Sequence, residues 1–275
     1  MAPQTMDIEV VREFWDRRPC QLRHSDLAVG SGDYFAAVER RRYFVEPHIA
    51  EFAAFNRWAG KRVLELGCGM GTDAVHFARA GASVTVVELS PKSLELCRRH
   101  FACRGVTATF VPGNAEELVQ LLPPQTFDLI YAMGVVHHTP HPERVLAAIP
   151  RFMHERSELR IMLYARWSWK VLAILARHGS RHLWQIDRVV PRYSEAQTGS
   201  PVTQVYSVRQ ARRLLQAFQI VSLRKTFIFP YRVDQYVQYR YVRVWYFRYL
   251  PAPVFKWLER VLGWHLLIVA RRGAR

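Results

Sequence analysis

An apolar run that ends in alternating glycines constrains the fold of this chain more than any other feature. The run covers residues 63–66, and Gly67, Gly69 and Gly71 follow it. A short run that is mostly aliphatic predicts a buried strand, and glycines at its end permit a turn that other residues avoid. A helix predicted over 72–80 would then expose its first N–H groups to a ligand. The run therefore predicts a nucleotide-cofactor loop.

Two carboxylates and one missing glycine limit the class of ligand that this loop can bind. Glu65 precedes the first glycine by two residues, and Glu88 ends a second apolar strand, where a carboxylate can accept from paired ribose hydroxyls. A dinucleotide site would have its third glycine three positions after the second, but position 72 is Thr72. A carboxylate at Glu65 would also repel a diphosphate. The loop favours a cationic, amine-bearing ligand such as S-adenosylmethionine.

Four stretches of the chain carry a family pattern in the expected order. They are Val63–Gly71, Val84–Leu89, Val111–Glu116 and Phe127–His138. In these stretches, within residues 60–165, the chain resembles the class I S-adenosylmethionine-dependent methyltransferases of the small-molecule type. The resemblance implies that S-adenosylmethionine is the methyl donor and S-adenosylhomocysteine the product.

The resemblance also implies a set of cofactor-binding residues. In this family the glycine loop faces the methionine part of the cofactor, and the acid ending the second strand holds the ribose. The expected contacts are Glu65, Gly67, Cys68, Gly69, Glu88, Leu89, Asn114, Ala115 and Met133. Asn114 stands where the family usually has Asp, and its carbonyl can still accept from the exocyclic amine of adenine. We expect somewhat weaker or altered binding there.

Methyl transfer from a sulfonium depends mainly on positioning the acceptor and removing its proton. His137 and His138 follow the fourth strand, where the acceptor commonly lies in this family. An imidazole there can take a proton near neutral pH, so we predict that the acceptor is held near these two residues. The alternative is that one histidine orients the loop and the other packs. His141 and its neighbours do not complete a ligand set, so no metal site is expected.

Predicted strands and helices alternate along the chain. Strands are expected at 62–66, 83–88, 107–111, 127–132, 159–164, 220–228 and 264–271, and helices at 72–80, 91–102, 115–121 and 142–153. Such alternation predicts a parallel sheet with helices on both faces. Ser207 and Gln210 form a capping box before a helix that ends near Phe218. The resemblance supplies the strand order of an α/β fold: a Rossmann-like, doubly wound, seven-stranded sheet with an antiparallel last strand.

The chain of 275 residues is half apolar and contains no Gly/Ser or Pro-rich linker, so we expect one domain over 1–275. Residues 59–164 would form its cofactor-binding core. Three additions remain outside this core: residues 1–58, 165–206 and 229–262. The first is expected to contain helices near 6–18 and 33–56. The resemblance assigns all three a lid role.

The cysteines show no Cys-x-x-Cys spacing, which indicates reduced thiols. Without a signal-peptide core or a membrane-length apolar stretch, a cytoplasmic location is expected.

Charge is concentrated in the second half of the chain. Residues 1–150 hold 16 Lys and Arg against 17 Asp and Glu, a net of −1, and residues 151–275 hold 23 against 6, a net of +17. A field of one sign attracts an anionic partner, and the alternative is an ordinary solvated surface. We therefore expect methyl transfer to a small metabolite that is anionic or partly apolar, with the acceptor atom and the oligomeric state left open.

Aromatic and Arg residues interleave over 231–249, which leaves rival partners open. The pattern can stack nucleic-acid bases, lie at a membrane interface, or form a lid helix whose aromatics are buried. The third interpretation is favoured, because aromatic stripes at helical spacing are usually buried and no RNA-binding motif accompanies them. An RNA or protein methyltransferase and a lipid-directed enzyme in peripheral contact with a membrane remain the alternatives.

Overall fold

The computed structural model describes residues 7–178, 186–194 and 199–273. Parts of the expected lid pieces, residues 1–6, 179–185 and 195–198, lie outside the described residues, as do 274–275.

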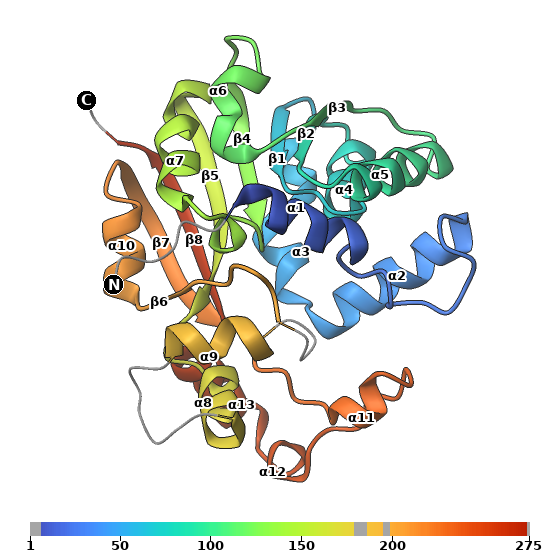
Figure 1. The fold of residues 1–275 in the computed structure, drawn as a ribbon, viewed down its shortest axis with the longest axis vertical. Helices are drawn as coiled ribbons and strands as arrows, with labels where there is room; N and C mark the ends of the chain where they lie inside the picture. The colour runs from blue at the N-terminus through green and yellow to red at the C-terminus, as the bar shows by residue number, and fades with distance from the viewer. Residues whose placement is uncertain (1–6, 179–185, 195–198, 274–275) are drawn as a thin grey trace.

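A twisted sheet organises the chain (Figure 1). Its strands are β1 Arg62–Leu66, β2 Ser83–Glu88, β3 Thr109–Pro112, β4 Phe127–Met133, β5 Met153–Ala165, β7 Phe218–Thr226 and β8 His265–Arg272, with the short β6 Val205–Tyr206 beside β5. The order is β3-β2-β1-β4-β5-β8-β7. Strands β1 to β5 pair in parallel, and β8 is antiparallel to both β5 and β7. The predicted Rossmann-like sheet with an antiparallel last strand is confirmed, and β6 is an addition to it.

Alternating side chains give the sheet an apolar layer on each face. Val63 packs with α4 (Thr72–Arg79) and α5 (Pro91–Cys103), whereas the next residue, Leu64, packs with α7 (Pro142–Ala148) and α10 (Val208–Leu214). Neighbouring residues of a strand point to opposite faces, so a run of apolar residues is buried on both sides. Helices α4, α5 and α7 follow the parallel strands β1, β2 and β4, which places the loops that carry the site at one edge of the sheet.

The predicted helix caps are present. Ser90 accepts from the Ser93 N–H at 3.0 Å with Pro91 at the first helical position, and Ser207 and Gln210 form the reciprocal capping box.

Four of the predicted helices differ from the structure. The helix expected over 115–121 is a 3-10 turn, Ala115–Glu117, followed by α6 (Leu118–Leu121), and the capped helix expected to end near Phe218 ends at Leu214 because β7 begins at Phe218. The helix expected over 33–56 divides into α2 (Gly32–Val45), α3 (His48–Ala53) and a 3-10 turn, Phe55–Trp58, because Pro47 lacks an N–H and disfavours helical geometry at the residue before it. The helix expected over 142–153 ends at Ala148 and continues as a 3-10 turn.

Strand β5 starts at Met153, six residues before the predicted position. Ser157 holds this irregular start, since its hydroxyl donates to the Phe127 carbonyl at 2.6 Å and accepts from the His154 N–H at 2.8 Å. Residues 154–158 are all polar and do not alternate with apolar residues, so the sequence pattern alone does not predict a strand there.

The additions to the core lie at the carboxyl edge of the parallel strands and at one end of the molecule. Helix α1 (Ile8–Arg17) passes in front of the sheet, and α8 (Trp169–His178), α9 (Ile186–Tyr193), α12 (Trp245–Arg248) and α13 (Ala252–Leu262) gather at the lower end in Figure 1. None of the helices in the described part of the chain has the length and apolar character that crossing a bilayer requires.

The aromatic stretch 231–249 is not one helix, which corrects the lid-helix interpretation. It contains α11 (Val233–Tyr236) and α12, and Tyr231, which precedes α11, forms a bridge with Arg243 in the segment between the two helices. Its first tyrosines surround Arg41 of α2, whose guanidinium carbon lies 4.1 Å from the Tyr236 ring and 4.5 Å from the Tyr239 ring. Tyr236 and Tyr239 therefore pack against the N-terminal addition. The expected burial is wrong for much of the stretch, because Phe247 is buried whereas Tyr239, Trp245, Tyr246 and Tyr249 are exposed.

Candidate functional site

A cavity opens at the carboxyl ends of β1, β2 and β4, beneath α1. It is lined by Ile8, Val11, Trp15, Cys20, Gln21, Arg42, Glu65, Gly67, Cys68, Gly69, Met70, Thr72, Asp73, Val87, Glu88, Leu89, Ser93, Gly113, Asn114, Ala115, Met133, Gly134, Val135, His138 and Thr139. All nine residues predicted to bind the cofactor are in this set, and so is His138. His137 is not in it.

The glycine loop needs glycine for its backbone shape and for close packing. Gly67, Gly69 and Gly71 all have positive φ, at 65°, 55° and 76°. A Cβ on Gly67 would collide with Val135, and one on Gly71 would collide with the Cys97 thiol. At Gly69 the nearest atom to such a Cβ would be Cys20 Cβ at 3.7 Å, so the loop is open at its centre.

Cys68 is a buried thiol within this loop. A hydrogen bond with Cys97 and burial hold the pKa of Cys68 well above its usual value, which makes the thiol a poor nucleophile. All four cysteines are free, as predicted.

Glu88 is fixed at the end of β2 by two backbone donors. Its Oε2 accepts from the Gly69 N–H at 2.8 Å and its Oε1 from the Ser90 N–H at 2.9 Å. Burial raises the pKa of Glu88, and these hydrogen bonds oppose the rise. The carboxylate is thus held at the position where the ribose of a nucleotide was predicted.

Glu65 has an unsatisfied oxygen in the same cavity. The side chain is buried, and its Oε2 has no hydrogen-bond partner among the described residues. Burial, followed by the neighbouring charge of Asp73, raises the pKa of Glu65 well above its usual value, and Arg42 opposes this. A buried carboxylate without a partner is costly, so this atom indicates a donor that the protein itself does not supply.

Asp73 and Arg42 form a buried ion pair that the sequence analysis missed. Arg42 donates to Asp73 from Nη2 at 2.7 Å and from Nε at 3.1 Å, and the hydroxyls of Tyr43 and Tyr131 donate to the same carboxylate at 2.8 and 3.1 Å. Asp73, two residues after the last loop glycine, could have been considered from the sequence. Arg42 lies on α2, 31 residues from its partner, and no local pattern marks it.

These residues fit S-adenosylmethionine better than a dinucleotide. Three carboxyl groups, from Glu65, Asp73 and Glu88, line the described part of the cavity with the single guanidinium of Arg42. Such a surface disfavours a diphosphate and suits a ligand with an ammonium group. Thr72, at the position of the missing glycine, donates to Gln21 at 3.0 Å and closes the space there.

Asn114 has a structural task as well as a place in the cavity. Its Oδ1 accepts from the Glu116 N–H at 3.0 Å and caps the 3-10 turn that follows β3. A carbonyl oxygen has two lone pairs, so the predicted contact with adenine can use the other one.

The two predicted catalytic histidines have different surroundings. His138 lines the cavity, and its Nδ1–H donates to the Val202 carbonyl at 2.8 Å. Because that carbonyl can only accept, the proton of the neutral ring lies on Nδ1, and Nε2 carries the lone pair. The Trp15 ring of α1 lies 5.1 Å from the His138 ring, edge to face.

His137 lies behind this loop. It is fully buried, and its ring is 3.8 Å from the ring of Tyr164. Burial, then electrostatic interaction with the neighbouring His138 and His265, hold the pKa of His137 well below its usual value. The Gln204 N–H donates to the His137 carbonyl at 2.9 Å, so the end of the 165–206 addition fixes the loop that presents His138.

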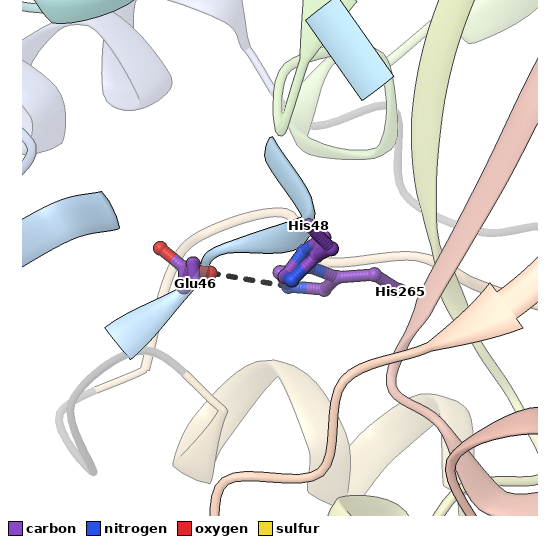
Figure 2. Close-up of side chains that lie close together, drawn as sticks. All are labelled: Glu46, His48 and His265. Carbon is purple, nitrogen blue, oxygen red and sulfur yellow. Dashed lines mark hydrogen bonds and ion pairs between the residues drawn. The ribbon is translucent and has the colours of Figure 1, made fainter. Parts of the chain in front are cut away.

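A third group of titratable residues, Glu46, His48 and His265, does not line the cavity. Figure 2 shows how their side chains lie together. His48 Nε2 is 2.8 Å from His265 Nδ1, and Glu46 Oε1 is 3.7 Å from the other nitrogen of His265. Burial lowers the pKa of His48 to about 3 and holds that of His265 well below its usual value, so both rings are neutral.

The geometry of this group resembles a chain from carboxylate to imidazole to imidazole. The three possible ligand atoms, one from each side chain, lie within 4.8 Å of one another. A bound zinc ion would need each of them about 2.1 Å from a single centre, so the side chains would have to move closer together. The group joins the corner between α2 and α3 to the start of β8, a contact across 217 residues that no local pattern predicts.

Comparisons with known proteins support the assignment from geometry. Residues 63–155 match the family model described as a methyltransferase domain. The ubiquinone biosynthesis O-methyltransferase of Photobacterium profundum is 34% identical over 94 residues, which cover 34% of this chain and 40% of that protein. The protein of the same name from Bordetella pertussis is 39% identical over 90 residues, 33% and 37% of the two chains. The matched segment is thus less than half of these relatives.

Solved structures resemble the chain over most of its length. The magnesium protoporphyrin IX methyltransferase of Synechocystis PCC 6803 with bound S-adenosylhomocysteine has a TM-score of 0.60 at 15% identity, over 97% of this chain and 100% of that one. SpnF, a 4+2 cyclase, has a TM-score of 0.58 at 17% identity, over 96% of both chains. At these identities the likeness shows the fold alone.

Fold, cavity and matched domain together define the class. Residues 63–155 match a methyltransferase domain, and the chain has the fold of the class I S-adenosylmethionine-dependent methyltransferases. Within that class, the sequence relatives named above are O-methyltransferases. The predicted family, fold and cofactor are confirmed.

Proposed function

We propose that the protein transfers the methyl group of S-adenosylmethionine to an oxygen atom of a small molecule, partly apolar and anionic, and releases S-adenosylhomocysteine. One observation carries the proposal: the partnerless Oε2 of Glu65 and the fixed carboxylate of Glu88 line the same cavity as His138. The choice of oxygen is supported by the O-methyltransferase relatives. The net charge of +17 in residues 151–275 supports an anionic acceptor.

The cavity residues divide between the parts of the cofactor. Glu65 would accept from the ammonium of the methionine part, and Arg42 would face its carboxylate while remaining paired with Asp73. Glu88 would accept from the ribose hydroxyls, and Leu89, Asn114 and Ala115 would surround the adenine. The bound cofactor supplies a methyl group that its sulfonium has already activated.

His138 is the proposed base on the acceptor side. With its Nδ1–H held by Val202, Nε2 would take the proton of the acceptor hydroxyl as that oxygen bonds to the methyl carbon and the carbon–sulfur bond breaks toward sulfur. His137 would act through packing, because its buried ring supports the loop and does not line the cavity. Trp15 and the other α1 residues over the cavity would exclude water, which supports the lid role expected for residues 1–58.

A labelled-methyl transfer assay on fractionated cell extract tests this function. We expect label to enter a small, hydroxyl-bearing compound, and we expect His138→Ala to abolish most of this transfer. Label found only in RNA or protein would replace the proposal with the macromolecular alternative. A protein that binds the cofactor and transfers no label would instead be a member of this fold that does not methylate. The fold alone does not fix the reaction, since a 4+2 cyclase also has it.

The RNA-directed alternative has one observation in its favour, the basic half of the chain. Nucleic-acid affinity falls steeply with ionic strength, so a filter-binding titration with total RNA at low and high salt discriminates the two functions. We expect no RNA complex at low salt.

A further inference from the structure

Three aromatic side chains near the end of the chain are exposed to an unusual degree. The exposed fraction is 75% for Trp245, 77% for Tyr249 and 59% for Trp257. Large aromatic side chains contribute most when they are buried, and contiguous exposed apolar surface marks an interaction site. These residues belong to α12, to the turn after it and to α13.

Helix α13 carries apolar side chains on two sides. No residue of the helix is buried, and Val254, Trp257 and Val261 are exposed at positions i, i+3 and i+7, which places them on one outward stripe. On the other side, the Phe255 ring packs edge to face with the buried Phe247 ring at 5.4 Å. The inward face attaches the helix to the protein, so the outward stripe is available to a partner.

Positive charge flanks this stripe on one side. Lys256 and Arg260, one helical turn apart, line a shallow hollow together with Trp257, Ala252 and Pro253. Residues 240–262 contain five Lys and Arg against one acid, Glu259, which is half-buried. The surface therefore combines a tryptophan, aliphatic side chains and cations within one small area.

Helix α8 extends the same end of the molecule. The rings of Trp169 and Tyr246 are 5.6 Å apart, which joins α8 to α12, and the nearby side chains of Trp167 and Leu172 are exposed. In Figure 1, α8, α12 and α13 lie at the lower end, opposite the end that carries α6 (Leu118–Leu121).

We infer that the aromatic-basic face, formed by Trp245, Tyr249, Val254, Lys256, Trp257, Arg260 and Val261, docks onto an anionic phospholipid bilayer. Tryptophan and tyrosine rings favour the interface between headgroups and acyl chains, and aliphatic side chains beside them enter its apolar side. Lys256 and Arg260 would bind lipid phosphates, which attract cations near the surface. The contact is peripheral, and it does not depend on the proposed methyl transfer.

The apolar stripe favours a bilayer over RNA. Base stacking uses aromatic rings and backbone charge, but it leaves exposed aliphatic side chains without a partner. Val254 and Val261 lie on either side of Trp257 on the same face of α13, where a membrane interface would cover all three.

Cosedimentation with vesicles tests the inference. The full chain should bind vesicles of phosphatidylcholine mixed with phosphatidylglycerol and bind vesicles of phosphatidylcholine alone much less. The variant Lys256→Glu/Arg260→Glu should bind the anionic vesicles at least about tenfold more weakly, because two cations near the surface become anions. The matched control is Arg209→Glu/Arg213→Glu, the same charge change at the same spacing on the exposed face of α10, and it should keep most of the binding.

A second variant tests the aromatic part of the face. Trp245→Ser/Trp257→Ser should lose the binding that persists at high salt, while thermal unfolding in the absence of vesicles stays unchanged, since both side chains are exposed. The inference would be overturned if the protein did not bind anionic vesicles. It would also be overturned if the two double Glu variants weakened that binding equally. A dimer in sedimentation equilibrium that the Trp variant dissociates and vesicles do not compete with would overturn it as well, because the face would then join two copies of the chain.

Discussion

Glu88 and Gly69 are joined by a hydrogen bond of 2.8 Å from the Gly69 N–H to the Glu88 carboxylate. The contact connects the end of β2 to the loop after β1, so one carboxylate both orders the glycine loop and faces the cavity. A bound nucleotide would meet a preformed site, and a change at Glu88 should affect ligand affinity more than the fold.

Glu88→Ala should weaken S-adenosylmethionine binding by about 1.5–3 kcal/mol, the worth of a hydrogen bond to a charged group. Isothermal titration calorimetry measures this directly. Glu95→Ala, on the exposed side of α5, is the matched control and should bind as the unchanged protein does. Equal affinity of Glu88→Ala and the control would show that Glu88 does not hold the ribose.

Asp73→Asn should destabilise the protein by about 3 kcal/mol, because it leaves the guanidinium of Arg42 in a buried site without its countercharge. Urea unfolding followed by circular dichroism gives the difference in the free energy of unfolding. Asp234→Asn removes a surface pair with Arg232 and should leave unfolding unchanged. If both variants unfold alike, the buried pair adds no stability.

His138→Ala should lower turnover by about 10²-fold or more, the usual contribution of a general base, and leave cofactor affinity nearly unchanged. His137→Ala should instead lower the free energy of unfolding by about 3 kcal/mol, because it removes a buried ring packed against Tyr164. The methyl-transfer assay and urea unfolding, run on both variants, separate the two roles. Interchanged results would reassign the base to His137.

Stability should fall as the solution is acidified below about pH 6.5. Burial lowers the pKa of His100 to about 4 from an unfolded value of 6.5, so between these values the unfolded chain binds a proton that the folded chain does not. Stability is therefore complete above pH 6.5 and declines by about 1.4 kcal/mol per pH unit for this group until about pH 4. His48 adds to the slope in the same direction.

His100→Phe should make that slope shallower. The ring stacks on Phe35 at 4.2 Å, so phenylalanine keeps the contact while it loses the proton site and the hydrogen bond to Met70. Urea unfolding at several pH values between 5 and 7.5 provides the comparison. An unchanged slope would show that His100 is already protonated in the folded protein.

Local sequence patterns predicted the parts of this molecule that depend on near neighbours. The strand ending at Leu66, the glycine loop, the Pro91 helix start and the Ser207 cap all follow from residues a few positions apart. The residues proposed to bind the cofactor lie together in the cavity because each stands at or just after the carboxyl end of a parallel strand, and these ends meet at one edge of the sheet.

What the sequence did not predict depends on distant contacts. Arg42 enters the cavity because α2 packs beside α4, and the His48–His265 pair forms only when the α2–α3 corner meets β8. His137 and His138 are adjacent in the sequence, yet the 3-10 turn places one ring in the cavity lining and the other behind it. Identical residue types at neighbouring positions gave no basis for separating their roles.

The most direct test of the central claim is calorimetric titration of the full chain with S-adenosylmethionine, with S-adenosylhomocysteine and with NAD. We expect saturable binding of both sulfur-containing nucleotides, weakened in parallel by Glu88→Ala, and no binding of NAD because its diphosphate would face Glu65 and Asp73. Binding of NAD without binding of S-adenosylmethionine would contradict the claim.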